Sequence, residues 1–270
     1  MTHWSTRSLA KVAMERGIIP RIAHSTVSLI LRDADLQPHR SRYWKTPTLN
    51  DEFRKRASPI LWCYENVDKL YDSGAIIICL DEKPNLQALE RMCPTKLVAP
   101  GMIEAQAQEF EYIRHGTVNF VAALIVHDGE AQARGWCLDK NDNEHLRPIL
   151  AEMFAEFRDA RRIYLIWDGE AQAISHRARK TTEFLEGYSK LVRAFMTPAR
   201  ASWLNQAELL LRAFSERYLK RGDWASRENL IDHLGASFRE YNHLYAHPFS
   251  WSWTRSDMRE WLSRHQTPIS

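Results

Sequence analysis

The sequence predicts an α/β core with flanking helices, preceded by a small all-helical segment. Over residues 74–264, short apolar runs rich in β-branched residues alternate with longer runs of helical period, which is the pattern of a sheet covered by helices. Residues 1–46 show helical patterns alone. Of the 270 residues, 44% are hydrophobic and 26% are charged, which excludes a chain that is disordered throughout. That length suits one large domain with a small appendage.

The small segment reads as two short helices. Residues 5–16 form the first, with Ser5 as its cap and Gly17 after its end, and the second begins near Ser25. Apolar residues at helical spacing predict a buried stripe on the second helix, at Val27, Ile30, Leu31 and Ala34. Four residues then face outward, as in the recognition helix of a helix-turn-helix that reads DNA: Ser25, Thr26, Ser28 and Arg32.

The charge of the chain is concentrated at its start. Residues 1–50 carry eight Lys and Arg against three acids, or +5, whereas the whole chain carries +3. A polyanion partner such as DNA explains this distribution, and a solvated basic surface is the alternative. Four basic residues in residues 38–45 are expected to track a phosphate backbone: His39, Arg40, Arg42 and Lys45. The alternative is a linker that packs Trp44 on the next domain.

The elements of the core follow in order. Residues 47–73 are a linker helix, and residues 75–80 a buried strand that Asp81 and Glu82 end abruptly. We expect further strands at 118–126, 135–138, 163–167 and 190–195, a helix at 144–160, and helices from 204 onward. The predicted core therefore spans 74–264, and 265–270 form a tail.

Acidic residues follow two of these strands. Asp81 and Asp168 each come directly after a buried apolar run, where a carboxylate can face a shared cleft. Carboxylates held close together need a cation, and oxygen ligands favour Mg²⁺ or Mn²⁺. Glu208 lies in the first turns of a later helix, with Asn205 three residues before it on the same face. The alternatives are acids that only cap turns, and Asp128 as the second acid.

Motifs in order along the chain resemble the bacterial insertion-sequence transposases of the mariner superfamily. They are THWSTRSLA (2–10), HSTVSLIL (24–31), LQPHRSRYWKT (36–46), CLDEKPNLQALER (79–91), EYIRHGTVNF (111–120), IYLIWD (163–168), TPARASWLNQAE (197–208) and YNHLYAHPFSWSWT (241–254). The resemblance implies a ribonuclease-H-like mixed sheet and a DDE triad of Asp81, Asp168 and Glu208 that holds two Mg²⁺ or Mn²⁺ ions. From their positions alone, Asn205 and Glu82 are expected to support the metal ligands, with a plain surface residue as the alternative for Glu82. Arg114 is expected to contact phosphate, with a structural turn at Gly116 as the alternative.

The resemblance also implies an activity and partners. The chain would hydrolyse phosphodiesters at the ends of a DNA element and transfer the strands into target DNA at TA sites, as a dimer on double-stranded DNA. No apolar run is long enough for a membrane span, residues 1–5 lack the basic-then-apolar pattern of a secretory signal, and the four cysteines form no C-x-x-C pair. We therefore expect a cytoplasmic protein on the bacterial nucleoid, with no membrane partner.

The chain departs from the family in two places. Gly169 replaces the usual Asn after the second acid, and the insert Glu170–Ala173 separates Asp168 from His176, so that Asp168 and Glu208 lie 40 residues apart. Of the two helix-turn-helix halves usual in the family, the sequence predicts the half nearest the catalytic domain, at residues 1–46. These departures motivate two alternatives: a decayed or co-opted transposase that only binds DNA, and a plain metal-dependent nuclease. The sequence Glu-Ala-Gln-Ala occurs three times, at 104, 130 and 170, beside turn residues, and we expect short loop insertions there.

Overall fold

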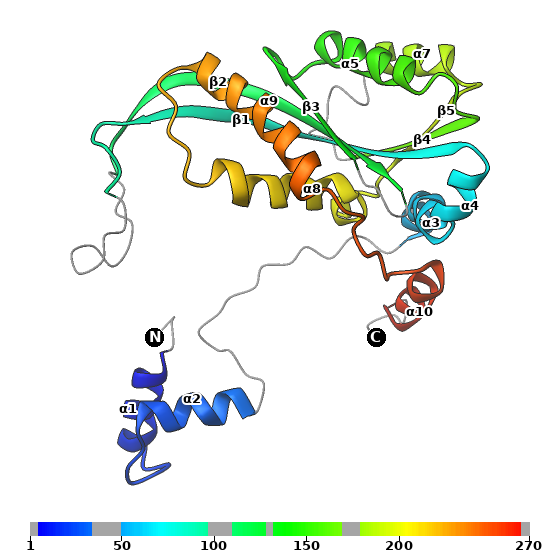
Figure 1. Ribbon diagram of the computed structural model, residues 1–270. Coiled ribbons are helices and arrows are strands. Elements are labelled where there is room, and N and C mark those ends of the chain that lie inside the picture. The colour runs from blue at the N-terminus through cyan, green and yellow to red at the C-terminus, as the bar shows by residue number, and fades with distance from the viewer. Residues whose placement is uncertain (1–4, 34–49, 97–109, 128–131, 169–178, 266–270) are drawn as a thin grey trace. The chain divides into compact units, whose positions relative to one another are not determined.

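The computed structural model describes residues 5–33, 50–96, 110–127, 132–168 and 179–265, and the chain divides into two compact units, Met1–Thr46 and Pro47–Ser270. Figure 1 shows their elements. The first unit contains α1 (Thr6–Glu15) and α2 (His24–Asp33), as the sequence predicts. Ser5 caps α1 through a capping box with Ser8, and Gly17 takes a left-handed φ of 66° after the helix.

The predicted stripe on α2 is only partly buried. Val27 is buried, but Ile30 is 55% exposed, so the prediction for Ile30 was wrong. The reason is that α2 packs on α1, a helix of only ten residues, which covers only part of its apolar face. Ala34 lies outside the described residues, as do the basic residues His39, Arg40, Arg42 and Lys45.

The second unit is built on one mixed sheet of five strands in the order β3-β2-β1-β4-β5. The strands are β1 (Ala75–Arg91), β2 (Tyr112–Val126), β3 (Gln132–Leu138), β4 (Arg162–Trp167) and β5 (Val192–Met196). β1, β2 and β3 pair antiparallel, whereas β4 and β5 run parallel to β1. The mixed sheet with flanking helices is confirmed.

The predicted end of the first strand at Asp81 was wrong. β1 continues to Arg91 because β2 pairs with it along its whole second half, down to Arg91 opposite Tyr112. This half alternates less strictly between buried and exposed positions, and its register shifts beside Asn85, which has a φ of 56°. The same pairing starts β2 six residues before the predicted strand.

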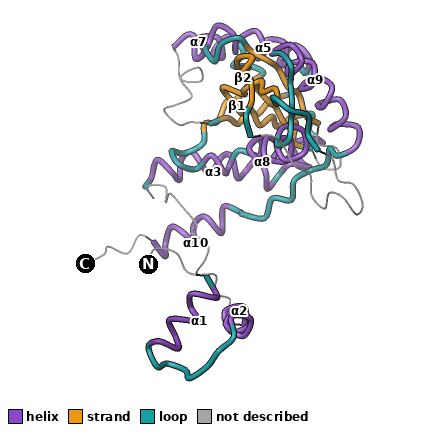
Figure 2. Tube along the Cα trace, turned by 90° about the vertical axis from the view of Figure 1, so that its left-hand side faces the viewer, coloured by secondary structure: helices purple, strands orange, loops and turns teal. Residues whose placement is uncertain are grey.

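Helices cover both faces of the sheet (Figure 2). One face packs against α3 (Asp51–Glu65), α8 (Gln206–Phe214) and α9 (Arg227–Leu244), and α10 (Arg255–His265) packs on α3. The other face packs against α5 (Asn143–Glu156) and α7 (Arg179–Gly187). Asp142 caps α5 by accepting bonds from the main-chain N–H groups of Glu144 and His145, each at 3.0 Å.

The predicted linker helix belongs to the core. It divides at Asn66 into α3 and a short α4 (Val67–Asp72). The apolar face expected from its period is buried against the sheet, at Phe53, Ala57, Ile60, Leu61 and Tyr64. α3 therefore positions the sheet instead of only connecting two parts of the chain.

The second Glu-Ala-Gln-Ala copy ends inside β3. Gln132 and Ala133 are strand residues, and Ala133 is buried opposite Leu124, so the expected loop position was wrong for these two residues. Asn242 on α9 donates to the main-chain oxygen of Ala133 and accepts from its N–H, both at 2.8 Å. The other two copies lie outside the described residues. None of the described helices combines the length and apolar character needed to cross a bilayer.

Candidate active site

Two of the predicted acids lie side by side where two parallel strands stop pairing. The last paired residues of β1 and β4 are Leu80 and Trp167, and Asp81 and Asp168 are the next residue of each strand. Both carboxylates are half-buried. Asp81 keeps its place in the sheet through β2, where it lies opposite Ala122, and its side chain accepts a bond of 2.8 Å from the N–H of Glu82. The fold thus brings together two acids that are 87 residues apart in the sequence.

The third acid, Glu208, lies in the first turn of α8 and is exposed. Asn205 caps this helix by accepting a bond of 3.2 Å from the N–H of Ala207. The amide nitrogen of Asn205 donates a bond of 2.8 Å to the main-chain oxygen of Leu80, directly before Asp81. Asn205 is fully buried. It therefore fixes the start of the helix that carries Glu208 to the strand that carries Asp81.

Tyr64 of α3 contacts both the strand of Asp81 and the segment that leads into α8. Its hydroxyl donates a bond of 2.8 Å to the main-chain oxygen of Leu204 and lies 3.2 Å from Sγ of Cys79. Burial raises the pKa of the Cys79 thiol to about 12, so it stays a neutral packing group at physiological pH. Leu204 precedes Asn205 and Cys79 lies two residues before Asp81, so this contact supports both carboxylate-bearing elements.

Thr197 is a site residue to which the sequence analysis assigned no role. Its hydroxyl donates a bond of 2.8 Å to Oδ1 of Asp168, and its main-chain N–H donates to the oxygen of Trp167 at 3.0 Å. The side chain is fully buried. Thr197 directly follows β5, the next parallel strand beyond β4, and that position is the signal that points to it.

The site is strongly acidic. Burial, followed by the charges of Glu208, Asp168 and Glu82, raises the pKa of Asp81 from 3.8 to about 7. The N–H of Glu82 opposes this shift by bonding the carboxylate. Near neutral pH a bound cation would therefore compete with a proton for Asp81.

The donor set fits a hard divalent cation. Three carboxylates offer only oxygen ligands, which suit Mg²⁺ or Mn²⁺. Within the described part of the chain, no three His, Cys, Asp or Glu side chains are gathered tightly enough to form a finished metal cluster. Like charges that lack a cation stay apart, so the final approach of Asp81, Asp168 and Glu208 would accompany metal binding.

The remaining predicted residues lie at different distances from these acids. Glu82 is half-buried next to Asp81. Arg114 is exposed on β2 opposite Leu89, eight residues along the strand from Ala122, and its guanidinium lies 5.6 Å from the ring of Tyr112. At about 3.3 Å per residue this is roughly 26 Å from the level of Asp81. Asp128, the rival second acid, lies outside the described residues, as do Gly169 and His176.

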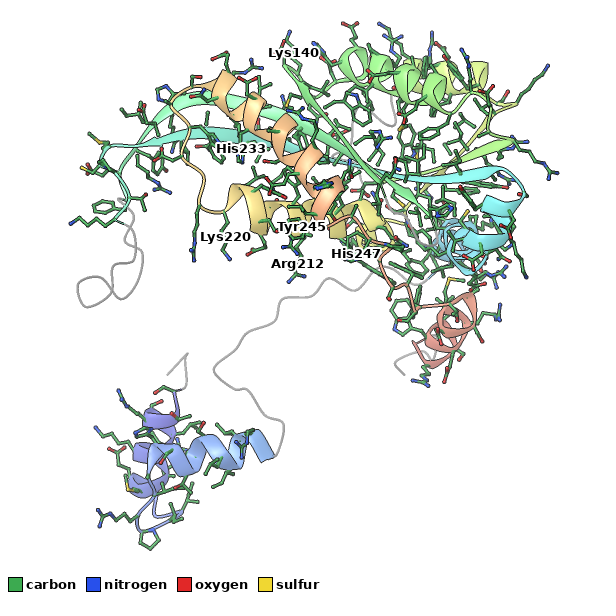
Figure 3. The ribbon with its side chains drawn as sticks, in the orientation of Figure 1. Lys140, Arg212, Lys220, His233, Tyr245 and His247 are labelled. Carbon is green, nitrogen blue, oxygen red and sulfur yellow. The ribbon has the colours of Figure 1, made fainter. Side chains whose placement is uncertain are left out.

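The predicted recognition residues of the first unit, Ser25, Thr26, Ser28 and Arg32, are exposed on α2. In the second unit, exposed cations continue beyond Glu208 along its own helix. Arg212 follows one turn later, and Lys220 comes after the π-helical turn Ser215–Leu219; both project on the side of α8 away from the sheet (Figure 3). Glu216 partly neutralises them, since Lys220 bonds it at 2.6 Å.

Three structures of the Mos1 transposase are among the solved structures that resemble this chain. The pre-cleavage Mos1 transpososome has a TM-score of 0.55 at 13% identity, and the match covers 99% of this chain and 76% of that chain. The Mos1 strand transfer complex has a TM-score of 0.55 at 15% identity, and the match covers 94% of this chain and 70% of that chain. The Mos1 mariner paired-end complex with Mn has a TM-score of 0.53 at 16% identity, and the match covers 87% of this chain and 67% of that chain. These likenesses confirm the predicted ribonuclease-H-like fold.

The family model for the DDE superfamily endonuclease matches residues 77–231, more than half of the chain. A search of curated protein sequences finds no match. The matched range contains Asp81, Asp168 and Glu208, the acids that the sheet and α8 place around one strand end. The chain therefore belongs to the DDE superfamily endonuclease family.

Proposed function

We propose that the protein is a DNA transposase that cuts phosphodiesters at the ends of a mobile element and joins the freed ends to target DNA. One observation carries the proposal: Asp81 and Asp168 follow the last paired residues of two adjacent parallel strands, and Asn205 ties the helix of Glu208 to the same strand. The likeness to the Mos1 pre-cleavage and strand transfer complexes supports a DNA substrate.

In this proposal Asp81, Asp168 and Glu208 hold two divalent cations, Mg²⁺ or Mn²⁺. Such ions activate an attacking oxygen and stabilise a leaving oxygen at phosphorus. In the first step a water oxygen forms a bond to phosphorus, the bond to the 3′ oxygen breaks, and that oxygen leaves as a hydroxyl. In the second step the oxygen of this hydroxyl forms a bond to a phosphorus of the target strand, the bond from that phosphorus to the target's own 3′ oxygen breaks, and that oxygen leaves as a hydroxyl. A TA site is the expected target. One P–O bond forms and one breaks in each step, so no energy source is consumed.

The supporting groups have separate tasks. Thr197 would orient the Asp168 carboxylate through its hydroxyl, and Asn205 would set the position of Glu208 through the backbone. Glu82 adds negative charge beside Asp81, so a cation bound there would be attracted more strongly.

The proposed partners are duplex DNA and a second copy of the chain. The basic first unit, with exposed Ser25, Thr26, Ser28 and Arg32 on α2, would dock on the element ends. His39, Arg40, Arg42 and Lys45 would follow the phosphate backbone, and Arg114 would contact phosphate farther along the hairpin. Two ends must be held together for joining, so we propose a dimer on DNA, in keeping with the paired-end complexes of Mos1.

The test is a strand-transfer assay with labelled duplexes that carry the inverted repeats flanking the gene. We expect Mg²⁺- or Mn²⁺-dependent cleavage followed by joining to a target plasmid, and loss of both in Asp81→Asn, Asp168→Asn and Glu208→Gln. Asp159→Asn is the control, because Asp159 is a 96% exposed acid that precedes β4, at the end of that strand opposite to Asp168. Cleavage that survives Asp81→Asn would refute the triad. Binding without cleavage would identify a co-opted DNA-binding protein, and cleavage without joining a plain nuclease.

A further inference from the structure

A second basic surface lies beside the sheet, apart from the three acids. It is a groove of about 680 Å³ between α3, the strands β4 and β5, and the start of α10. Four of its described lining residues are cationic and none of those lining residues is acidic: Arg54, Lys55, Arg193 and Arg255. We propose that this groove binds a single-stranded segment of DNA that continues from the cleaved phosphodiester. The proposal rests on the proposed transposase function.

Two of the four cations form ion pairs within the protein, and the other two are available to a ligand. Arg54 pairs with Asp51 at 3.0 Å, and Arg255 pairs with Glu65 at 2.7 Å. Lys55 and Arg193 are exposed, and neither has an ion-pair partner in the described part of the chain. They come from two different elements that line the groove, α3 and β5, so two separate cations are available to neutralise phosphates of one strand.

Three aromatic side chains also line the groove. Tyr164 and Phe195, on the adjacent strands β4 and β5, stack with their centroids 6.0 Å apart at 10°, and Trp62 of α3 meets Tyr164 edge-on at 5.8 Å. The guanidinium of Arg193 lies 5.4 Å from the centre of the Phe195 ring. The hydroxyl of Tyr164 has no hydrogen-bond partner among the described residues, and it is not buried. The groove thus offers half-buried ring faces and a free donor next to cations.

The groove leads toward the carboxylates. Phe195 lies two residues before Thr197, whose hydroxyl bonds Asp168. A smaller hollow of about 350 Å³, lined by the first turns of α3 and residues 198–200, adjoins this end of β5. From Arg193 to Thr197 the strand advances about 13 Å, which a few nucleotides of a DNA strand span. A strand leaving the scissile phosphate along β5 would therefore meet the groove directly.

The chemistry favours a single strand over duplex DNA or an acidic peptide. Aromatic faces interleaved with cations are the recurring design of single-strand sites, because unpaired bases stack on the rings while phosphates meet the cations. The bases of a duplex are already stacked on one another, so a duplex would use only the cations. An acidic peptide would likewise leave the rings unused.

The experiment measures binding of a fluorescent oligothymidine of about a dozen nucleotides to the full chain by anisotropy, in EDTA so that cleavage is prevented. We compare Lys55→Glu/Arg193→Glu with the matched control Lys140→Glu/Arg158→Glu, which makes the same charge change at exposed residues away from the groove. We expect at least about tenfold weaker binding in the groove variant alone, and a salt dependence lowered by about 1.4 in the log–log slope for two lost phosphate contacts. Phe195→Leu, which keeps the charge, should also weaken binding.

Photocrosslinking with bromodeoxyuridine oligonucleotides locates the strand. We expect crosslinked peptides that contain Trp62, Tyr164 or Phe195. Crosslinks elsewhere, or equal affinity in the groove and control variants, would overturn the proposal. Equal weakening of single-stranded and duplex DNA would show a duplex-binding surface instead, and displacement of the oligonucleotide by polyglutamate without crosslinks would show a peptide site. The transposase assignment is judged separately, by metal-dependent cleavage of duplex ends in the wild-type protein.

Discussion

Asn205 joins the helix that carries Glu208 to the strand that carries Asp81, because its buried amide donates a hydrogen bond of 2.8 Å to the main-chain oxygen of Leu80. Leu80 directly precedes Asp81, and Asn205 begins the helix of Glu208. One side chain therefore sets the separation between a strand and a helix whose carboxylates must approach the same cation.

Asn205→Ala should impair both folding and cleavage. It leaves the oxygen of Leu80 and the N–H of Ala207 without partners, at a cost of about 1–3 kcal/mol in the free energy of unfolding, measured by urea denaturation. The control is Asn242→Ala, since Asn242 makes the same kind of donor and acceptor pair with Ala133, away from the acids. We expect similar stability losses but a large fall in cleavage rate for Asn205→Ala alone. Equal cleavage by the two folded variants would contradict this role.

Thr197→Val should reduce metal-dependent cleavage while leaving the fold intact. The change keeps the shape of the side chain but removes the hydroxyl that holds Asp168 at 2.8 Å. Loss of a group that orients a metal ligand typically lowers metal affinity or activity about 10- to 100-fold. The measurement is cleavage rate against Mg²⁺ concentration, and Thr197→Ser, which restores the hydroxyl, should recover most of the loss. If the serine variant were as impaired as the valine variant, packing and not the hydrogen bond would be responsible.

The stability of the metal-free protein should fall as pH rises from about 4 to about 7. Burial and neighbouring acids raise the pKa of Asp81 from 3.8 to about 7, so the folded state binds a proton that the unfolded state releases in this range. Asp81→Asn removes that cost, and at pH 8 in EDTA we expect it to exceed the wild type by up to about 4 kcal/mol in the free energy of unfolding.

With added Mg²⁺ or Mn²⁺, the wild-type protein should become more stable than Asp81→Asn at pH 8. The cation stabilises ionised Asp81, so wild-type protein gains melting temperature with metal at pH 8, whereas Asp81→Asn gains much less. Thermal unfolding with and without metal, at pH 5 and pH 8, measures both effects. A wild-type protein whose stability stayed flat over this pH range would show that Asp81 is not held in an acidic, buried site.

Gly135→Ala should destabilise the sheet. Gly135 is exposed on β3, but a Cβ there would lie 2.7 Å from the buried ring of Phe120 and 3.0 Å from the buried ring of Phe238. Overpacking of this kind costs about 1–3 kcal/mol, which thermal unfolding would detect. Gly187→Ala at the end of α7 is the matched control, because nothing lies within 4 Å of the added carbon and its stability should not fall. Equal melting temperatures for the two variants would show that the sheet and α9 separate readily.

Much of this architecture could be predicted from local pattern. The buried face of α3, the cap Ser5, and the strands that end at Trp167 and near Met196 follow from side-chain period and capping chemistry, which act within a few residues. The length of β1 could not be predicted in this way. Asp81 and Glu82 have the polar character of a strand end, and only the pairing with β2 extends the strand beyond them. The exposure of Ile30 depended on how much of α2 its neighbour α1 covers.

The sequence by itself determined the types of the elements and which acids follow apolar runs, since both depend on the order of side chains along one segment. Only the tertiary structure decided that Asp81 and Asp168 are neighbours, because the parallel pairing of β1 with β4 joins segments that are far apart in the chain. The roles of Thr197 and Asn205 also emerged there: each acts through a hydrogen bond across strands or between a helix and a strand, which no local pattern records.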